Sequence, residues 1–233
     1  MVIAYAQQSA SGCGILTPID AIAVPARAID STWAASAEPA PYGLTELSRG
    51  TVAASLPHIP LLLWVSGSAS EGWSNLTVGG FSNWSAGTDF RIGVRSSLNL
   101  SVFRGFSSVC AAKVGINAVF RRKEWTFGAS IDDLAVVGSR AAPWVRVAAM
   151  VNLDFYDLAL DVIMNSTNEM GLLLTGVWRP VPVLELVLGL LTAPTTIRLD
   201  GRISAFGDLA VVVGLQHFEG LGFSPHIALQ MPW

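Results

Sequence analysis

The chain has 233 residues, of which 52% are hydrophobic and only 13% are charged, whereas about a quarter of the residues of a typical soluble domain are charged. The formal net charge of -3 and the pI near 5.5 give no basic footprint, which excludes nucleic acid as an expected partner. The mean hydropathy of +0.51 would suit membrane helices, which need about 20 mostly apolar residues in a row. The longest charge-free stretch in the body, 51–70, is interrupted by Pro57 and Pro60. The apolar content is therefore high but finely divided.

The first 49 residues differ in pattern from the rest. Residues 1–6 resemble the end of a secretory signal peptide, because Ala4-Tyr5-Ala6 precedes Gln7 as the small residues of a cleavage site do; an accidental match is the alternative. Residues 7–49 contain four prolines, many alanines and serines, and no sustained alternation. We predict that 7–49 form a plug or a periplasmic segment and that 50–233 form the main domain.

From about Thr51 onward the dominant period is two. For example, Phe90, Ile92 and Val94 alternate with charged or small residues. Alternate side chains of a strand point to opposite faces, so such a segment has one apolar and one polar face. Most of the segments approach the 9 to 11 residues with which a tilted strand crosses a bilayer. Fourteen strands are predicted, at 51–56, 60–67, 74–83, 87–95, 98–106, 110–121, 124–132, 143–151, 154–163, 170–178, 182–191, 195–204, 208–217 and 221–232.

The connections between these strands also carry a pattern. Longer connections, such as 131–143 and 165–169, alternate with tight turns expected at 95–97, 122–123, 152–153, 180–181 and 206–207. Outer-membrane barrels combine short periplasmic turns with longer outside loops, so the tight turns are expected on the periplasmic side together with both termini. The pattern predicts a bacterial outer-membrane location.

Tryptophans gather near the ends of the predicted strands, where indole rings suit the interface between lipid and water. A soluble core that is capped by tryptophans is the alternative. The tryptophans concerned are Trp73, Trp84, Trp125, Trp144, Trp178 and Trp233.

If the apolar faces meet lipid, the sheet has to close, because an open edge in hydrocarbon leaves N–H and C=O groups unsatisfied at several kcal/mol each. We therefore predict an all-β fold, a closed antiparallel transmembrane β-barrel of about 14 strands, with 12 as the alternative. Charged residues in mid-strand then become candidates for lining the lumen. These are Arg91, Lys113, Arg146, Asp161, Glu185, Arg198, Asp200 and Arg202.

Two interpretations of these charges stay open. They can form a solvated wall with ion pairs between strands, or they can form a selectivity ring or ligand clamp. Arg198 and Arg202 are the best candidates for a clamp, because they lie on one face of the same predicted strand.

The last predicted strand has one apolar face and ends in an aromatic residue. This resembles the C-terminal assembly signal of outer-membrane barrels, although Phe is the usual final residue. Pro225 predicts a bulge or a shortened strand. The side chains of the apolar face are Leu221, Phe223, Ile227, Leu229, Met231 and Trp233.

Four short segments carry a family resemblance. They are Pro25-Ala26-Arg27-Ala28, Pro41-Tyr42-Gly43-Leu44, Asp89-Phe90-Arg91-Ile92-Gly93-Val94 and Trp125-Thr126-Phe127-Gly128-Ala129-Ser130-Ile131-Asp132-Asp133-Leu134. With the overall layout, they resemble the FadL-like superfamily of fourteen-stranded outer-membrane barrels, in particular the branch related to the type IX secretion shuttle barrel. The second segment lacks the Asn of that branch, and Asp133 stands where the family has Asn. The resemblance implies either passage of hydrophobic molecules or the holding of a secreted protein at the cell surface.

The sequence contains no recognisable catalytic motif. No nucleophile motif accompanies His58, His217 or His226, and neither a phosphate loop nor a metal-ligand spacing occurs. We expect no enzymatic activity, no cofactor and no metal. Cys13 and Cys110 are compatible with one disulfide or with two unpaired thiols.

Three functional hypotheses follow. The first is an outer-membrane, porin-like channel or transporter for small solutes, hydrophobic ones included. The second is a non-conducting structural or docking barrel of a secretion or envelope complex, and the third is a soluble periplasmic β-sandwich. The expected partners are outer-membrane lipid and either a hydrophobic small molecule or a protein of a secretion system.

Overall fold

The computed structural model describes residues 32–39, 47–55, 61–105, 108–138, 143–165, 170–192, 195–204 and 209–232. All regular secondary structure within these ranges is β-strand, which confirms the all-β prediction. The described residues contain no helix with the length and apolar character needed to cross a membrane. The strands are β1 Thr32–Pro39, β2 Ser48–Ser55, β3 Leu61–Ser70, β4 Trp73–Ser85, β5 Phe90–Phe103, β6 Val109–Arg122, β7 Trp125–Val137, β8 Trp144–Asn152, β9 Tyr156–Asn165, β10 Met170–Val181, β11 Leu184–Thr192, β12 Thr195–Ser204, β13 Ala210–Phe218 and β14 Gly222–Pro232.

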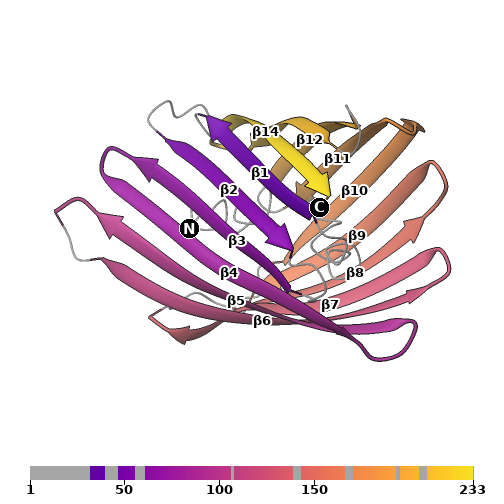
Figure 1. Cartoon of the computed structure of the whole chain (residues 1–233), viewed down its shortest axis with the longest axis horizontal. Helices are drawn as coiled ribbons and strands as arrows, with labels where there is room; N and C mark the ends of the chain where they lie inside the picture. The colour runs from indigo at the N-terminus through magenta and orange to yellow at the C-terminus, as the bar shows by residue number, and fades with distance from the viewer. Residues whose placement is uncertain are drawn as a thin grey trace.

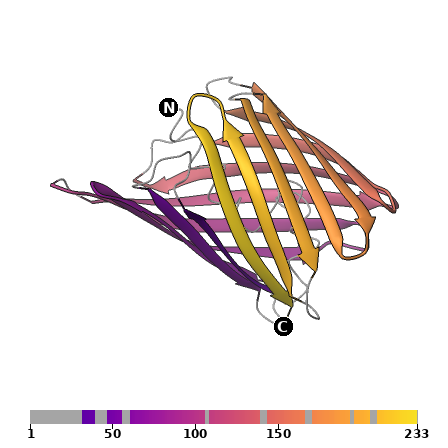
Figure 2. The same ribbon diagram turned by 90° about the horizontal axis from the view of Figure 1, so that it is seen from above.

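The described strands form a closed barrel. Each strand pairs antiparallel with its neighbours in the chain, and β1 pairs on one side with β2 and on the other with β14. Figure 1 shows β1, in indigo, beside β14, in yellow. In Figure 2 the yellow and orange strands run steeply while the magenta strands behind them run across, as tilted strands on different walls of a barrel do. One closed sheet is incompatible with two stacked sheets, so the β-sandwich hypothesis is wrong.

One predicted turn is wrong. The sequence pattern suggested a turn at 95–97 between two strands, but β5 runs without interruption from Phe90 to Phe103. Arg95, Ser96 and Ser97 pair in register with Phe81, Gly80 and Gly79 of β4. The apolar alternation keeps its phase through the two serines, which is why the strand continues. Two predicted strands are therefore one.

One strand lies where none was predicted. β1, Thr32–Pro39, falls inside the range 7–49 that was assigned to a plug or a periplasmic segment, and β2 begins at Ser48. The remaining residues of that range, 7–31 and 40–46, and the predicted signal remnant 1–6 lie outside the described residues. The fourteen described strands match the predicted number because one strand is gained and two are merged; the twelve-strand alternative is wrong.

The barrel has two rims. We call the rim at which β1 begins and β14 ends the N/C rim. Turns at 123–124, 153–155 and 182–183 lie on it, within two residues of the predicted positions, while the predicted turn at 206–207 lies outside the described residues. Short turns also occur on the opposite rim, at 71–72 and 219–221. The expectation that tight turns are confined to one side is therefore wrong.

Candidate functional site: the outer and inner faces of the barrel wall

The outer face of the wall is an apolar band. Leu188 of β11, which is 55% exposed, pairs with the exposed Leu199 of β12, and Leu190 pairs with Ile197. The band continues around the barrel through other strands. A contiguous apolar surface of this extent marks contact with a membrane or a partner. Its exposed members on other strands include Val65, Val78, Leu98, Leu100, Ile116, Val147, Leu158, Leu160, Leu172, Leu174, Val213 and Ile227.

Exposed aromatic side chains gather on the outer face near the N/C rim. Trp125 and Phe127 stack there with their ring centroids 5.9 Å apart. Rings at this level suit the boundary between hydrocarbon and water. The predicted girdle residues Trp84, Trp125 and Trp178 belong to this group, whereas Trp73 and Trp144 are half-buried at the opposite rim and Trp233 lies outside the described residues. The exposed rings near the N/C rim are Trp84, Phe90, Phe120, Trp125, Phe127, Phe155, Tyr156 and Trp178, and two further exposed rings, Phe103 and Phe223, lie at the opposite rim.

All eight predicted lumen residues lie at inward-facing positions of their strands. Asp161, Arg198 and Asp200 are buried, and the other five, Arg91, Lys113, Arg146, Glu185 and Arg202, are half-buried. Five of the eight belong to three clusters of ion pairs on strands β8 to β14. Arg91 and Lys113 lie apart from these clusters, on β5 and β6.

The first cluster joins β8 and β9. Arg146 Nε donates to Asp161 Oδ2 at 3.1 Å, and the terminal guanidinium nitrogen also contacts that oxygen. Asp161 pairs in register with Ala148, two residues from Arg146. The two side chains therefore meet diagonally between neighbouring strands. The sequence placed both residues on the inner face, but it could not pair them.

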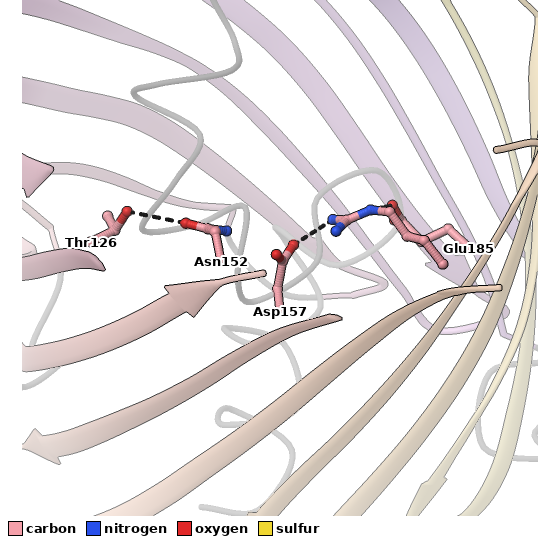
Figure 3. Close-up of polar contacts among 5 residues, drawn as sticks. Thr126, Asn152, Asp157 and Glu185 are labelled. Carbon is pink, nitrogen blue, oxygen red and sulfur yellow. Dashed lines mark hydrogen bonds and ion pairs between the residues drawn. The ribbon is translucent and has the colours of Figure 1, made fainter. Parts of the chain in front are cut away.

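The second cluster lies close to the N/C rim. Arg179 of β10 forms ion pairs with Asp157 of β9 and with Glu185 of β11, the latter at 3.0 Å. Figure 3 shows Asp157 and Glu185 on the inner side of the wall, with Thr126 and Asn152 beside them. Sequence reasoning missed Arg179, because a turn was expected at the next residue. Asp157 shares its parity with Asp161, a signal that could have identified it.

The third cluster spans β12, β13 and β14. Arg198 Nε donates to Asp200 Oδ2 at 2.6 Å, and His226 Nε2 lies 3.0 Å from Asp200 Oδ1. Gly214 sits between Asp200 and His226 in register. A Cβ atom there would lie 2.1 Å from Asp200 Oδ1 and 2.3 Å from His226 Cε1. The glycine on β13 is therefore what lets side chains two strands apart meet.

This third cluster changes the interpretation of the predicted clamp. Arg198 forms an ion pair with Asp200. The predicted clamp, in which Arg198 and Arg202 together bind a ligand, therefore does not fit this arrangement. The side chains of Arg198, Asp200 and His226 are only 7%, 2% and 4% exposed. His226, which the motif search left without a role, is part of this buried polar group.

The wall formed by β3, β4 and β5 has a different character. The guanidinium carbon of Arg95 lies 4.9 Å from the centre of the Trp64 ring, within the range of a cation–π contact. Gly79 leaves the space that the ring fills, since a Cβ there would lie 1.8 Å from Trp64 Cη2. Arg95 was missed because it was predicted to lie in a turn.

Neutral polar groups continue the inner face of β4 and β5 toward the rim opposite the N/C rim. The Asn75 amide donates to Ser101 Oγ at 2.8 Å, and the Asn99 amide donates to Thr77 Oγ1 at 2.8 Å. These cross-strand bonds satisfy side chains that face away from the apolar band. The inner wall is therefore hydrophilic beyond its charged residues.

A substitution at Gly79 tests how the Trp64 ring packs against this glycine. We expect Gly79→Ala to displace the indole and to lower the free energy of unfolding by about 1–3 kcal/mol, the usual cost of overpacking. Urea unfolding of the refolded barrel in lipid vesicles measures this change. The double variant Gly79→Ala/Trp64→Leu should recover most of the loss. An unchanged stability of Gly79→Ala would contradict the described packing.

The described residues carry no group of three His, Cys, Asp or Glu side chains that could hold a metal ion. Cys110 is a free, exposed thiol, and its candidate disulfide partner, Cys13, lies outside the described residues, as does His58. His217 lies on the opposite face from His226, with its ring 4.7 Å from that of Phe223.

Comparison with known proteins identifies the architecture. No protein-family model matches the chain, and no curated protein matches its sequence. Among solved structures, the outer membrane protein Omp33 of Acinetobacter baumannii is similar over 88% of this chain and 98% of its own, with a TM-score of 0.60 and 8% identity. The KdgM porin matches over 87% of this chain and 98% of its own, with a TM-score of 0.50 and 7% identity. At such identities the likeness concerns the fold alone, which is that of an outer-membrane porin-type β-barrel. It gives no support to the FadL-like branch, which stays a prediction.

Proposed function

We propose that the chain is a channel of the bacterial outer membrane that passes small, water-soluble molecules. The observation that carries the proposal is the contrast between the two faces of one closed wall. The outer face is an apolar band with exposed aromatic rings toward both rims, most of them at the N/C rim, and the inner face holds buried ion pairs. A barrel in lipid needs an apolar outside, and a polar lumen suits an aqueous path. The porin-type fold supports the same location and role.

The inner wall favours polar over hydrophobic solutes. Three ion-pair clusters and the amide and hydroxyl network of β4 and β5 line it. Apolar inward side chains also occur, as in the group of Met150, Ala159, Val177 and Val187, but each of them lies two or four positions along its strand from a charged inward residue. A hydrophobic solute would have to pass these charges.

The same barrel wall would also suit the second candidate function, which is that of a non-conducting docking barrel in a secretion or envelope complex. It differs only in whether solutes pass through, so conductance separates the two.

The test combines a gel assay with electrical recording. The full chain, refolded into detergent, should migrate faster unboiled than boiled, because a closed barrel resists unfolding by the detergent of the gel. Added to a planar lipid bilayer, it should produce stepwise currents in potassium chloride. A heat-modifiable barrel without current would favour the docking role. A chain that stays soluble without detergent and shows no shift in migration would overturn the membrane assignment.

A further inference from the structure

The outer face of the barrel carries an exposed cation at the level of the aromatic rings. Arg122 is the last residue of β6, shares its parity with the exposed Phe120, and pairs in register with the exposed Trp125 of β7. Among the outward-facing strand positions whose side chains the structure describes, Arg122 is the only Asp, Glu, Lys or Arg. A charge on the lipid-facing side of a barrel is tolerated near the interface, so the position of Arg122 at the N/C rim places its guanidinium among the lipid headgroups.

A second cation follows directly in the turn between β6 and β7. Lys123 is exposed and has a φ of 53°, which lies in the left-handed region that tight turns use. Within the part of the chain that the structure describes, neither Arg122 nor Lys123 takes part in an ion pair or a side-chain hydrogen bond. Both cations are therefore available to an anion from outside the protein.

The carboxylates near this turn do not share the outward side of Arg122. The Arg121 amide donates to the Asp89 carbonyl and so extends the β5–β6 register by one pair, and a corresponding bond to the Glu124 carbonyl extends the β7–β8 register. Asp89 and Glu124 therefore have the inward parity of their strands. Asp154, a third carboxylate at this rim, lies one hairpin away, in the turn between β8 and β9. The outward side of the β6–β7 hairpin is thus positively charged.

Aromatic rings lie on the membrane side of the two cations. Phe120 pairs in register with Phe90 of β5 and with Phe127 of β7, one outward position further from the rim than Arg122. Trp125 stacks on Phe127 with 5.9 Å between the ring centroids. All four rings are exposed. Rings of this kind mark the boundary between hydrocarbon and headgroups, so the cations lie at the depth of the lipid phosphates.

We infer that Arg122, Lys123 and Trp125, which we name the basic–aromatic patch, bind the phosphate of an anionic glycerophospholipid. A guanidinium holds a phosphate through two parallel N–H donors, and a lysine ammonium adds a point charge. The indole N–H of Trp125 supplies a further donor at the same level. Positive charge at this depth favours a headgroup with net negative charge over a zwitterionic one. The inference concerns the outer face of the wall, so it holds whether or not the barrel conducts.

The test is native mass spectrometry of the refolded full chain in a neutral detergent, titrated with phosphatidylglycerol and, separately, with phosphatidylcholine. The apparent dissociation constant of the first bound lipid should be lower for phosphatidylglycerol. Arg122→Gln should weaken the binding of phosphatidylglycerol by about fivefold, the effect of one basic residue near an anionic headgroup, and leave the binding of phosphatidylcholine unchanged. Arg122→Lys keeps the charge but loses the paired donors, so we expect a smaller loss.

A matched variant removes the same charge at the opposite rim. Arg104 is exposed in the connection after β5, and Arg104→Gln should bind phosphatidylglycerol as the parent does. Equal losses in Arg104→Gln and Arg122→Gln would overturn the inference, because the effect would then follow net charge alone. A parent that does not distinguish the two lipids would also overturn it.

Two further measurements complete the test. Tighter binding of lipid A than of phosphatidylglycerol would overturn the assignment to a glycerophospholipid. Should Arg122→Gln fail to show a heat-dependent gel shift, Lys123→Asn replaces it with a similar expected loss, because asparagine suits the left-handed backbone of the turn. The absence of current in a planar bilayer would reject the channel function and leave these binding results as they are.

Discussion

Replacement of Asp200 by alanine is expected to lower the free energy of unfolding by about 3–5 kcal/mol, because removal of one partner strands a buried charge. Asp200 accepts from Arg198 Nε at 2.6 Å and lies 3.0 Å from His226 Nε2. Arg198 is only 6% exposed, so water cannot easily replace the lost carboxylate. Urea unfolding in lipid vesicles, followed by the loss of the heat-dependent gel shift, gives the difference in stability.

A double substitution distinguishes two causes of the lost stability, namely an unpaired buried charge on Arg198 and the loss of packing around Asp200. In Arg198→Met/Asp200→Asn both charges are removed and the shape of each side chain is largely kept, so no buried charge is left without its partner. We expect this variant to be clearly more stable than Asp200→Ala. Equal loss in both variants would show that packing around Gly214, rather than ion pairing, holds this part of the wall. An Asp200→Ala barrel as stable as the parent would contradict the buried cluster.

Leu188→Arg tests the outer face. Leu188 lies in the middle of β11, paired with Gly176 and Leu199, and points outward, and the residue is 55% exposed. A charged side chain on the lipid face near the midplane costs about 2–4 kcal/mol. We expect a loss of this size in the free energy of unfolding in phospholipid vesicles.

The control places the same charge at the level of the headgroups. Val183 is exposed in the turn between β10 and β11, at the N/C rim, and Val183→Arg should cost only about 0–1 kcal/mol, as near the interface. The dependence on depth is the decisive result. If both variants unfolded at the urea concentration of the parent, the outer band would not face lipid.

The sequence by itself determined which side chains face in and which face out. Side-chain direction alternates along any strand, so the parity of Ile197 and Leu199 against Arg198 and Asp200 fixed the two faces before any pairing was known. The same local rule placed all eight predicted charges on the inner face. It would also have kept β5 in one piece, because Ile92, Val94, Leu98 and Leu100 share one parity and that phase does not break at Ser96.

Only the tertiary structure decided which strands are neighbours and which inward side chains meet. The alternation in β1 is weak, since three of its eight residues are alanines. Its place in the wall comes from pairing with β2 and with β14 at the far end of the chain. The contact between Asp200 and His226 across Gly214, and the seat of Trp64 on Gly79, depend on the register between strands. Register comes from long-range pairing around the closed sheet, so parity within one strand could not reveal them.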